Sequence, residues 1–395
     1  MRILMPTSEF PPAPGGVSAV AWEQANGLAK LGHEVVVETL DFSQYGAPPT
    51  PEADIDIRYR LIRAKAIKRV LPLSIHNRKT AKAFRPDVVL CPQYRGTGIP
   101  AMLAAGQAKC PLVMYLHSNE IRTELSNPLR FFCVNKVLRS AARLMTNTHN
   151  TKRLVSEWVP KLDKANMIVV HPGIHLHRLQ SPTAQAEGIQ LRKEWLQKLG
   201  VKSDCSPIVL GSLSRVSLQK GIDVTIKSIA SISRTHPNLP IVYIVGGVGP
   251  DAEQCQEMVR EHNLVNRVLF IGPINYPNNT AFFNAIDVFV QPSQPYKVFI
   301  ESFGISPLEA QACGKPVIST DWGGIPEAVV RDKSGILVPV KNQQAVEDAI
   351  LKLAVDTELR TRMGQAGIEH AKQFSWEKHA KQVEEVLLSL VPKSA

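Results

Sequence analysis

The feature that most constrains the fold is a regular alternation of short apolar segments with longer amphipathic ones. It occurs twice, once in each half of the chain. The apolar segments fall at residues 2–6, 33–40, 86–92, 111–117, 143–148 and 167–173, and then at 207–215, 240–247, 267–272, 286–292, 315–320 and 335–340. Segments of helical length such as 17–31, 223–235 and 251–262 separate them. This alternation predicts an α/β protein with two doubly wound, Rossmann-like domains.

We expect an N-terminal domain over residues 1–182 and a C-terminal domain over 183–374. Residues 375–395 contain a last helix, at about 376–390, that is expected to cross back to the first domain. The polar stretch 180–190 is the expected connection. Ligands of open α/β sheets bind beyond the carboxyl ends of the strands. Two facing sheets would therefore place the site in a cleft between the domains.

Several classes of protein are disfavoured. No apolar run approaches the roughly 18 residues of a membrane span, and MRILMPTSEF lacks the apolar stretch of a secretory signal. The 6 cysteines are scattered singly, without a Cys-x-x-Cys pair, which argues against a zinc site or a disulfide framework. We therefore expect a cytoplasmic protein.

Residues 301–310, ESFGISPLEA, contain helix-start signals. Ser306, Pro307 and Glu309 have the order of an N-cap, a first-turn proline and a capping-box glutamate. The predicted helix begins there and ends at Gly314, and Glu301 lies in the loop before it. Taken alone, this pattern needs no more than a capping role for Glu309 and a solvated loop position for Glu301.

Cations and glycines follow other strands. Arg215 ends the segment 207–215, and Lys220 follows in a tight loop closed by Gly221. Two cations at a strand end can bind a diphosphate through charge-assisted hydrogen bonds.

Gly15 and Gly16 precede a helix after the first strand, and a second Gly-Gly pair stands at 323–324. Such turns let a ligand approach backbone N–H groups. The Gly-x-Gly-x-x-Gly spacing of dinucleotide-binding folds is missing, so a dehydrogenase is poorly supported.

Three of these segments together resemble one family. SRVSLQKGID (214–223), ESFGISPLEAQACGKPVI (301–318) and GGIPEAV (323–329) are similar, in order and spacing, to motifs of glycosyltransferase family 4, retaining enzymes of the GT-B fold. The resemblance covers roughly residues 205–375. It is looser in the first half, where it rests on the Gly15-Gly16 loop, His117 and HPGI (171–174).

The resemblance implies roles for particular residues. Glu309 would accept hydrogen bonds from the ribose hydroxyls of a sugar nucleotide, and Glu301 from a hydroxyl of the donor sugar. Arg215 and Lys220 would neutralise the diphosphate, and His117 would lie near the donor sugar. The remaining implied donor-binding positions are Gly15, Gly16 and the backbone N–H groups around Phe303, Gly304 and Ile305.

The implied reaction moves a sugar from a UDP- or GDP-sugar to an acceptor hydroxyl with retained anomeric configuration. The leaving phosphate helps to deprotonate the acceptor, so no catalytic base is named, and no cofactor beyond the donor is expected. Asp54-Ile55-Asp56 resembles the metal motif of a different glycosyltransferase fold, but it follows PPTPEA rather than a buried strand. We expect no bound metal.

Two departures from the family pattern stand out. His175 replaces an aspartate that many relatives have after the glycine of the inter-domain motif. A longer insertion, QPYKVFI (294–300), separates Ser293 from Glu301 and is expected to reshape the donor-sugar pocket.

The distribution of charge along the chain bears on the kind of acceptor. Residues 1–180 hold 24 Lys or Arg and 13 Asp or Glu, whereas residues 181–395 hold 22 of each, so the net charge of +11 lies in the first half. Residues 58–85 contain no acidic residue, and Lys136, Arg139 and Arg143 form a second basic group at helical spacing. The GT-B fold places the acceptor in this half. Solvated helix faces are the plain alternative for these charges.

We expect an acceptor glycan or lipid-linked saccharide, attachment to an anionic membrane surface through residues 58–85, and location on the cytoplasmic face of a membrane. Nucleic acid is not an expected partner, because no aromatic residues alternate with the basic ones. A glycosyltransferase with a small soluble acceptor, a nucleotide-sugar epimerase and a non-catalytic binding protein are the other readings.

Overall fold

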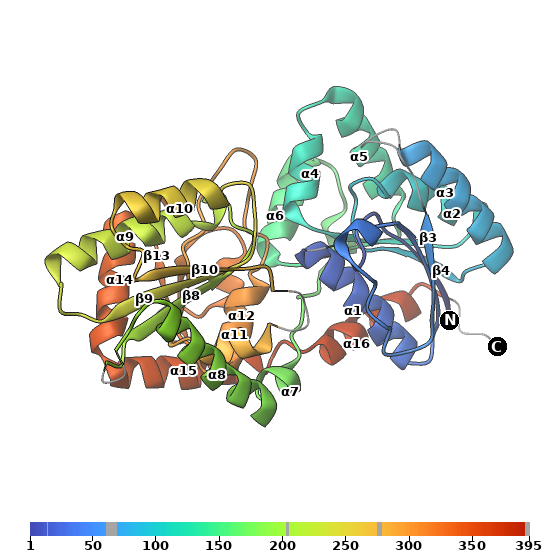
Figure 1. Cartoon of the computed structure of the whole chain (residues 1–395). Coiled ribbons are helices and arrows are strands. Elements are labelled where there is room, and N and C mark those ends of the chain that lie inside the picture. Colours follow the sequence, from blue (N-terminus) through green and yellow to red (C-terminus); the bar gives the residue numbers. More distant parts are fainter. Residues whose placement is uncertain (14, 61–68, 203–204, 275–278, 392–395) are drawn as a thin grey trace. The chain divides into compact units, whose positions relative to one another are not determined.

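The computed structural model describes residues 1–13, 15–60, 69–202, 205–274 and 279–391, and the chain divides into two compact units (Figure 1). Unit 1 comprises Met1–Gly173 together with helix α16 (Trp376–Leu388), and unit 2 comprises Ile174–Ser375. The division falls earlier than the boundary expected after residue 182. Among the described residues, no helix is both long and apolar enough to cross a bilayer.

The polar stretch 180–190 is not the connection between the units, contrary to expectation. It lies in unit 2, and most of it begins helix α8 (Pro182–Lys198). The Ser181 side chain accepts a hydrogen bond from the Ala184 N–H, and Pro182 occupies the first turn. The polar composition of this stretch belongs to a solvent-facing helix rather than to a linker. The capping residues stabilise the start of that helix although it has few apolar residues.

The sheet of unit 1 has seven parallel strands in the order β3-β2-β1-β4-β5-β6-β7. This order places a topological switch point between β1 and β4, where ligands of such sheets bind. The strands are β1 (Arg2–Pro6), β2 (Glu34–Leu40), β3 (Ile55–Arg60), β4 (Val88–Cys91), β5 (Leu112–Leu116), β6 (Arg143–Thr146) and β7 (Met167–Val169).

Helices cover both faces of this sheet. The helices before α16 are α1 (Gly16–Lys30), α2 (Val70–Phe84), α3 (Gly98–Ala108), α4 (Ser118–Glu124), α5 (Pro128–Ser140) and α6 (His149–Trp158). Side chains of α2, α3, α5 and α6 share one hydrophobic core with alternate residues of the strands, including Leu4, Val89 and Met114. Helix α1 lies on the other side of the sheet, as its right-handed crossover from β1 to β2 requires, and α16 lies there with it (Figure 1).

Helix α16 packs directly on α1. The Gln24 Nε2 and His379 Nε2 atoms are 3.2 Å apart, and His33 Nε2 is 2.8 Å from Glu384 Oε1. A Cβ added to Gly27 would lie 2.5 Å from the Ala380 Cβ, so glycine permits the close approach of the two helices. The last helix is therefore an integral part of unit 1.

Unit 2 has six parallel strands in the order β10-β9-β8-β11-β12-β13, with its own switch point between β8 and β11. The strands are β8 (Ile208–Leu213), β9 (Ile241–Gly246), β10 (Val268–Gly272), β11 (Val288–Gln291), β12 (Val317–Thr320) and β13 (Gly335–Val338). The helices are α7 (Leu176–Leu179), α8, α9 (Ile222–Thr235), α10 (Ala252–Glu261), α11 (Thr280–Ala285), α12 (Ile305–Ala312), α13 (Ile325–Ala328), α14 (Gln343–Val355) and α15 (Thr357–Ala371).

The inner strands of unit 2 are buried on both faces, which explains their largely apolar sequences. Leu210 and Val290 pack in a core with α9, α10 and α14, whereas their neighbours Val209 and Phe289 pack in a second core with α8, α11 and α12. Alternate side chains thus serve two separate cores, one on each side of the sheet.

One strand of unit 1 was not expected from the sequence, and one expectation about its basic residues is wrong. Asp56 belongs to edge strand β3 and pairs with Arg58, its Oδ2 lying 2.6 Å from Arg58 Nη2. The second basic group is not on one helix, because Lys136 and Arg139 belong to α5 whereas Arg143 opens β6. Of the run 58–85, the basic residues at 63, 65 and 68 lie outside the described residues.

Candidate functional site

The loops after β8 and β11 meet at the switch point of unit 2. Arg215 and Lys220 follow β8, and Ser293 and Glu301 follow β11. Gly221 has φ of +72°, and a Cβ there would lie 2.1 Å from the carbonyl oxygen of Pro292. Only glycine lets the two loops approach this closely.

Lys220 and Glu301 form a largely buried ion pair. Lys220 Nζ lies 2.8 Å from Glu301 Oε2 and 3.0 Å from Oε1, and the two side chains are 16% and 8% exposed. Ser293 Oγ donates to Glu301 Oε2 at 2.7 Å. The carboxylate of Glu301 is therefore fixed in position by hydrogen bonds at the strand ends, and Glu301 is not a solvated loop residue.

The insertion 294–300 lies over this pair. Lys220 Nζ is 5.4 Å from the centroid of the Phe299 ring, and that ring is 5.8 Å from the ring of Trp322. The face of an aromatic ring attracts a nearby cation electrostatically. Phe299 and Ser293 contact the pair, yet sequence reasoning assigned neither a role. The position of Phe299 inside an unusual insertion next to Glu301 was the available signal.

Helix α12 begins earlier than the sequence predicts. Its first residue is Ile305, preceded by Gly304 in the left-handed region with φ of 102°, so Ser306 is not the N-cap and Glu309 closes no capping box. Glycine makes this start accessible, because other residues rarely adopt that conformation. The predicted end is close to the observed one, since Cys313 is the C-cap.

The second Gly-Gly turn holds the loop before α12. Gly324 N donates to the Glu301 carbonyl oxygen at 2.8 Å. Gly323 has φ of +66°, and a Cβ there would lie 2.3 Å from the same oxygen. The turn thus fixes the backbone of Glu301 while Lys220 and Ser293 fix its side chain.

Glu309 is buried, with 6% of its surface exposed, and its Oε1 accepts a hydrogen bond from Asn279 Nδ2 at 2.8 Å. Burial raises the pKa of Glu309 to about 7, and the bond from Asn279 opposes this rise. Asn279 was not identified from the sequence. A buried carboxylate with remaining acceptor capacity suits a ligand hydroxyl.

The other predicted donor-binding residues of unit 2 offer different groups. The side chains of Phe303 and Ile305 pack in the core, where the Phe303 ring is 5.7 Å from that of Phe374, so only their backbones remain for a ligand. Arg215 is exposed and forms no ion pair within the described part of the chain. Among the described residues, Arg215 therefore offers an unpaired charge, whereas Lys220 is paired with Glu301.

In unit 1, Gly15 and Gly16 lie where the sequence placed them. Gly15 has φ of +125° and precedes α1, which begins at Gly16. No atom lies within 4 Å of a Cβ added to Gly15. The backbone conformation, rather than crowding, therefore explains why this residue is glycine.

His117 follows β5 and is 6% exposed. Its Nε2 is 3.2 Å from the carbonyl oxygen of Pro92, at the end of β4. Burial lowers the pKa of His117 to about 4, and nearby His379 acts in the same direction. The imidazole is therefore neutral at physiological pH and can take part in hydrogen bonding but does not supply a positive charge.

Glu120 is a residue that sequence reasoning missed. Its carboxylate accepts from the backbone N–H groups of His117 at 2.8 Å, Tyr94 at 2.6 Å and Arg95 at 3.1 Å. Burial raises the pKa of Glu120 to about 8, and these three bonds oppose the rise. Glu120 joins the loops after β4 and β5 and so positions His117. Its place three residues after a strand end was the only signal.

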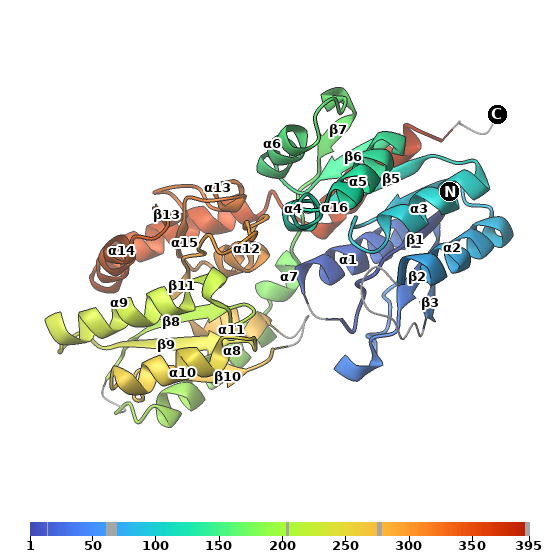
Figure 2. The same cartoon turned by 90° about the horizontal axis from the view of Figure 1, so that it is seen from above.

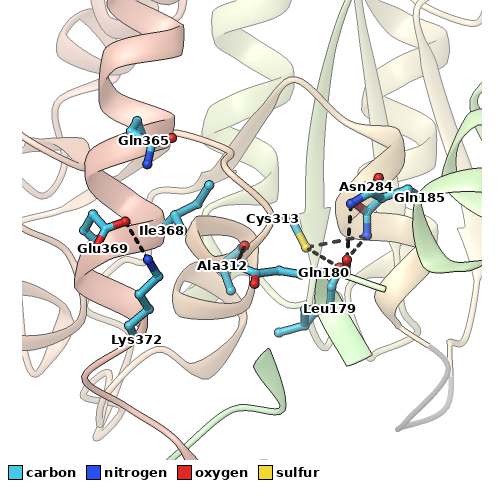
Figure 3. Close-up of a pocket in the computed structure, with 10 residues that line it drawn as sticks. All are labelled: Leu179, Gln180, Gln185, Asn284, Ala312, Cys313, Gln365, Ile368, Glu369 and Lys372. Atoms are coloured by element: carbon cyan, nitrogen blue, oxygen red, sulfur yellow. Dashed lines mark hydrogen bonds and ion pairs between the residues drawn. The ribbon is translucent and has the colours of Figure 1, made fainter. Parts of the chain in front are cut away.

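A cavity of about 390 Å³ in unit 2 lies away from these strand ends (Figure 3). It is formed at the C-terminal end of α12 and by α7, α8, α11 and α15. Cys313 contacts the carbonyl oxygen of Leu179 there, and burial raises the pKa of its thiol to about 12, so the thiol is unreactive. None of the predicted donor-binding residues lines this cavity.

Two family models match the chain. The model "Glycosyltransferase Family 4" matches residues 14–178, and "Glycosyl transferases group 1" matches residues 192–370. They correspond closely to units 1 and 2 and together cover most of the chain.

Curated relatives agree with these models. A D-inositol 3-phosphate glycosyltransferase of Corynebacterium urealyticum is 33% identical over 66% of this chain, and the match spans 60% of that relative, less than two thirds of its length. The enzyme of the same name from Streptomyces bingchenggensis is 30% identical over 93% of this chain and 83% of its own length.

Solved structures show the same fold. HepE from Anabaena, in complex with UDP and glucose, has a TM-score of 0.78 and 20% identity, covering 99% of this chain and 100% of that one. Sucrose-phosphate synthase from Thermosynechococcus elongatus has a TM-score of 0.79 and 20% identity, covering 98% of each chain. The chain therefore belongs to glycosyltransferase family 4, a family of sugar-transferring enzymes built on two Rossmann-like domains of the GT-B type.

Proposed function

We propose that this protein is a retaining glycosyltransferase that moves a sugar from a nucleoside diphosphate donor to an acceptor hydroxyl. The observation that carries the proposal is the group at the switch point of unit 2. There the Lys220–Glu301 ion pair stands at the ends of β8 and β11, and the buried carboxyl of Glu309 is held on α12. Family membership favours transfer over the epimerase and over a non-catalytic role.

A UDP-sugar is the donor that we favour, with a GDP-sugar as the alternative. The support is that HepE, which shares the fold, was solved with UDP and with UDP-glucose. Lys220 and Arg215 would neutralise the diphosphate, and no metal ion would be needed for that task. The backbone N–H groups at the start of α12 would assist, because helix N-termini favour anions.

Each carboxylate has a separate role in this proposal. Glu309 would accept hydrogen bonds from the ribose hydroxyls, and Glu301 from a hydroxyl of the sugar. The departing phosphate would take the proton of the acceptor, so no side chain serves as base. The roles of His117, Gly15 and Gly16 near the donor stay predictions, since these residues belong to unit 1.

Two classes of acceptor are candidates. A glycan or lipid-linked saccharide is the acceptor that the basic residues of unit 1 first suggested. The relatives' name, D-inositol 3-phosphate glycosyltransferase, favours instead a small phosphorylated polyol as a second candidate. Both acceptors are anionic or lie close to anionic groups, so they agree with the charge of unit 1.

Donor binding provides the test. UDP and the matching UDP-sugar should raise the unfolding temperature, because a ligand that binds only the native state stabilises it. Replacing Glu309 with alanine should weaken UDP binding by roughly ten- to a hundredfold, since charge-assisted hydrogen bonds to the ribose are lost. Isothermal titration calorimetry measures this ratio.

An isosteric control separates charge from shape. Glu309→Gln keeps the volume and part of the acceptor capacity, so its loss should be smaller than that of Glu309→Ala. If UDP binds Glu309→Ala as tightly as the native protein, the ribose role is refuted. If no UDP, GDP or ADP sugar shifts the unfolding temperature, the proposal of a nucleotide-sugar donor fails.

UDP affinity should also fall on acidification. The pKa of unliganded Glu309 is raised by burial to about 7, and a protonated carboxyl accepts fewer hydrogen bonds. Affinity should therefore be higher at about pH 8 than at about pH 6, on either side of this pKa. The nucleotide's own phosphate titrates in this range too. Glu309→Gln keeps the contribution of the phosphate but lacks the carboxyl, so the difference between the two proteins in calorimetry isolates Glu309, and an identical pH dependence in both would contradict the assignment.

A further inference from the structure

One face of unit 1 exposes large apolar side chains on three neighbouring helices. The residues are Leu71 and Ile75 of α2, Leu103 of α3, and Leu129 and Phe132 of α5, which are 70%, 48%, 38%, 68% and 64% exposed. Helix α3 contacts both α2 and α5 and lies between them in Figure 2. Single exposed apolar residues are ordinary, but a group on adjoining elements marks a contact surface.

Helix α2 carries apolar and basic residues on the same solvent-facing side. Successive residues are rotated by about 100° around a helix, so Leu71, Ile75, Arg78, Lys79 and Lys82 fall within an arc of about 100°. All five are exposed. The opposite side of α2 is buried in the core of unit 1. The apolar pair occupies the first turns of the helix and the cations occupy the last turns.

Helix α5 repeats this arrangement. Leu129, Phe132, Lys136 and Arg139 lie on one side of the helix and are exposed, again with the apolar residues in the first turn. Both α2 and α5 run from the carboxyl edge of the sheet to its amino edge, because each leads into the next parallel strand. Their apolar first turns therefore lie towards the edge of the sheet at which α/β folds bind ligands.

The charge of this face has a single sign. Helices α2, α3 and α5 contain no aspartate or glutamate. Their cations are Arg78, Lys79, Lys82, Arg130, Lys136 and Arg139. Lys79, Lys82 and Lys136 are exposed and form no ion pair with any residue that the structure describes. Two copies of this face would repel each other, so a second copy is a poor occupant.

We propose that this face of unit 1 binds the surface of a lipid bilayer that contains anionic lipids. Leucine and phenylalanine enter the boundary between headgroups and acyl chains, and the lysines and arginines contact the anionic headgroups. Bound in this way, the enzyme would meet a lipid-linked acceptor at the membrane surface. The lipid-binding step itself does not depend on the identity of the donor or of the acceptor.

Vesicle flotation tests the proposal with the full chain. We expect recovery with vesicles of phosphatidylcholine and phosphatidylglycerol, and much less with phosphatidylcholine alone. Each cation at an anionic surface contributes about fivefold to partitioning, so Lys79→Gln, Lys82→Gln and Lys136→Gln together should reduce it by about a hundredfold. Leu71→Ser with Phe132→Ser should also abolish most of the recovery.

The matched control is Leu388→Ser. Leu388 is 50% exposed but belongs to α16, on the other side of the sheet, so its recovery should equal that of the native protein. The unfolding temperature of each variant establishes that it is folded.

Equal recovery with and without phosphatidylglycerol would overturn the proposal. So would recovery of the lysine variant at the native level. If instead the native chain fails to float and its sedimentation shows a dimer that Leu71→Ser with Phe132→Ser dissociates, the face binds another copy and the lipid proposal is wrong. A normal UDP response in a protein that does not float leaves the proposed transferase function intact.

Discussion

Replacing Lys220 with methionine is expected to weaken UDP binding by about a hundredfold. A charge-assisted hydrogen bond contributes about 1.5 to 3 kcal/mol, and the variant also leaves the Glu301 carboxylate without its cationic partner beside the diphosphate. That carboxylate is 8% exposed, so water screens it poorly. Calorimetry with UDP measures the loss, and the unfolding temperature shows how far the unpaired charge destabilises unit 2.

Two further variants separate the loss of the cation from the effect of the unpaired carboxylate. Lys220→Met combined with Glu301→Gln should recover part of the UDP affinity and most of the stability, because the unpaired charge is removed. Arg215→Gln should weaken UDP binding by about tenfold. It should leave the unfolding temperature unchanged, since Arg215 is exposed. Native UDP affinity in Lys220→Met would show that the diphosphate lies elsewhere.

Replacing Glu301 with glutamine should move two quantities in opposite directions. In the unliganded protein, both carboxylate oxygens of Glu301 contact Lys220 Nζ, so UDP must compete with this partner. Glutamine frees the ammonium, and UDP should bind severalfold more tightly. The variant also loses the charged acceptor for a sugar hydroxyl. Its kcat/KM for transfer should therefore fall by roughly ten- to a hundredfold.

Ser293→Ala is the matched control for this prediction. It removes the 2.7 Å hydrogen bond to Glu301 but leaves the Lys220–Glu301 pair in place. Transfer should fall modestly and UDP affinity should change little. If Glu301→Gln lowers UDP affinity and transfer together, Glu301 supports the diphosphate site as a whole and has no separate role with the sugar.

The arrangement of strands and helices could be predicted largely from sequence. Continuous apolar runs such as 240–247 become strands buried on both faces, and their regular separation by amphipathic segments specifies parallel order. Strand β3 was missed for a related reason. It lies at the sheet edge, and Asp56, Arg58 and Arg60 interrupt any apolar pattern. Their charges are satisfied by neighbours, as Arg60 is by Glu38 at 2.8 Å.

The residues of the candidate site could be predicted from the sequence, but the contacts between them could not. Motif spacing singled out Lys220 and Glu301, yet only the close approach of two loops at Gly221 brings them together. Ser306 and Pro307 imitate a helix start, but the left-handed Gly304 allows α12 to begin sooner. Asn279 and Glu120 act through contacts between segments far apart in sequence, which local patterns do not encode.

The place of α16 in unit 1 has a consequence for biosynthesis. Residues 174–375 form a contiguous segment that can complete its own sheet as soon as it leaves the ribosome, whereas α1 must wait for Ala380 and His379 to be translated. Unit 1 is thus the first part to be translated but the last to complete its fold. Until then the surface of α1 around Gln24 and Gly27 is uncovered, and nascent chains released before residue 376 would be natural clients for chaperones.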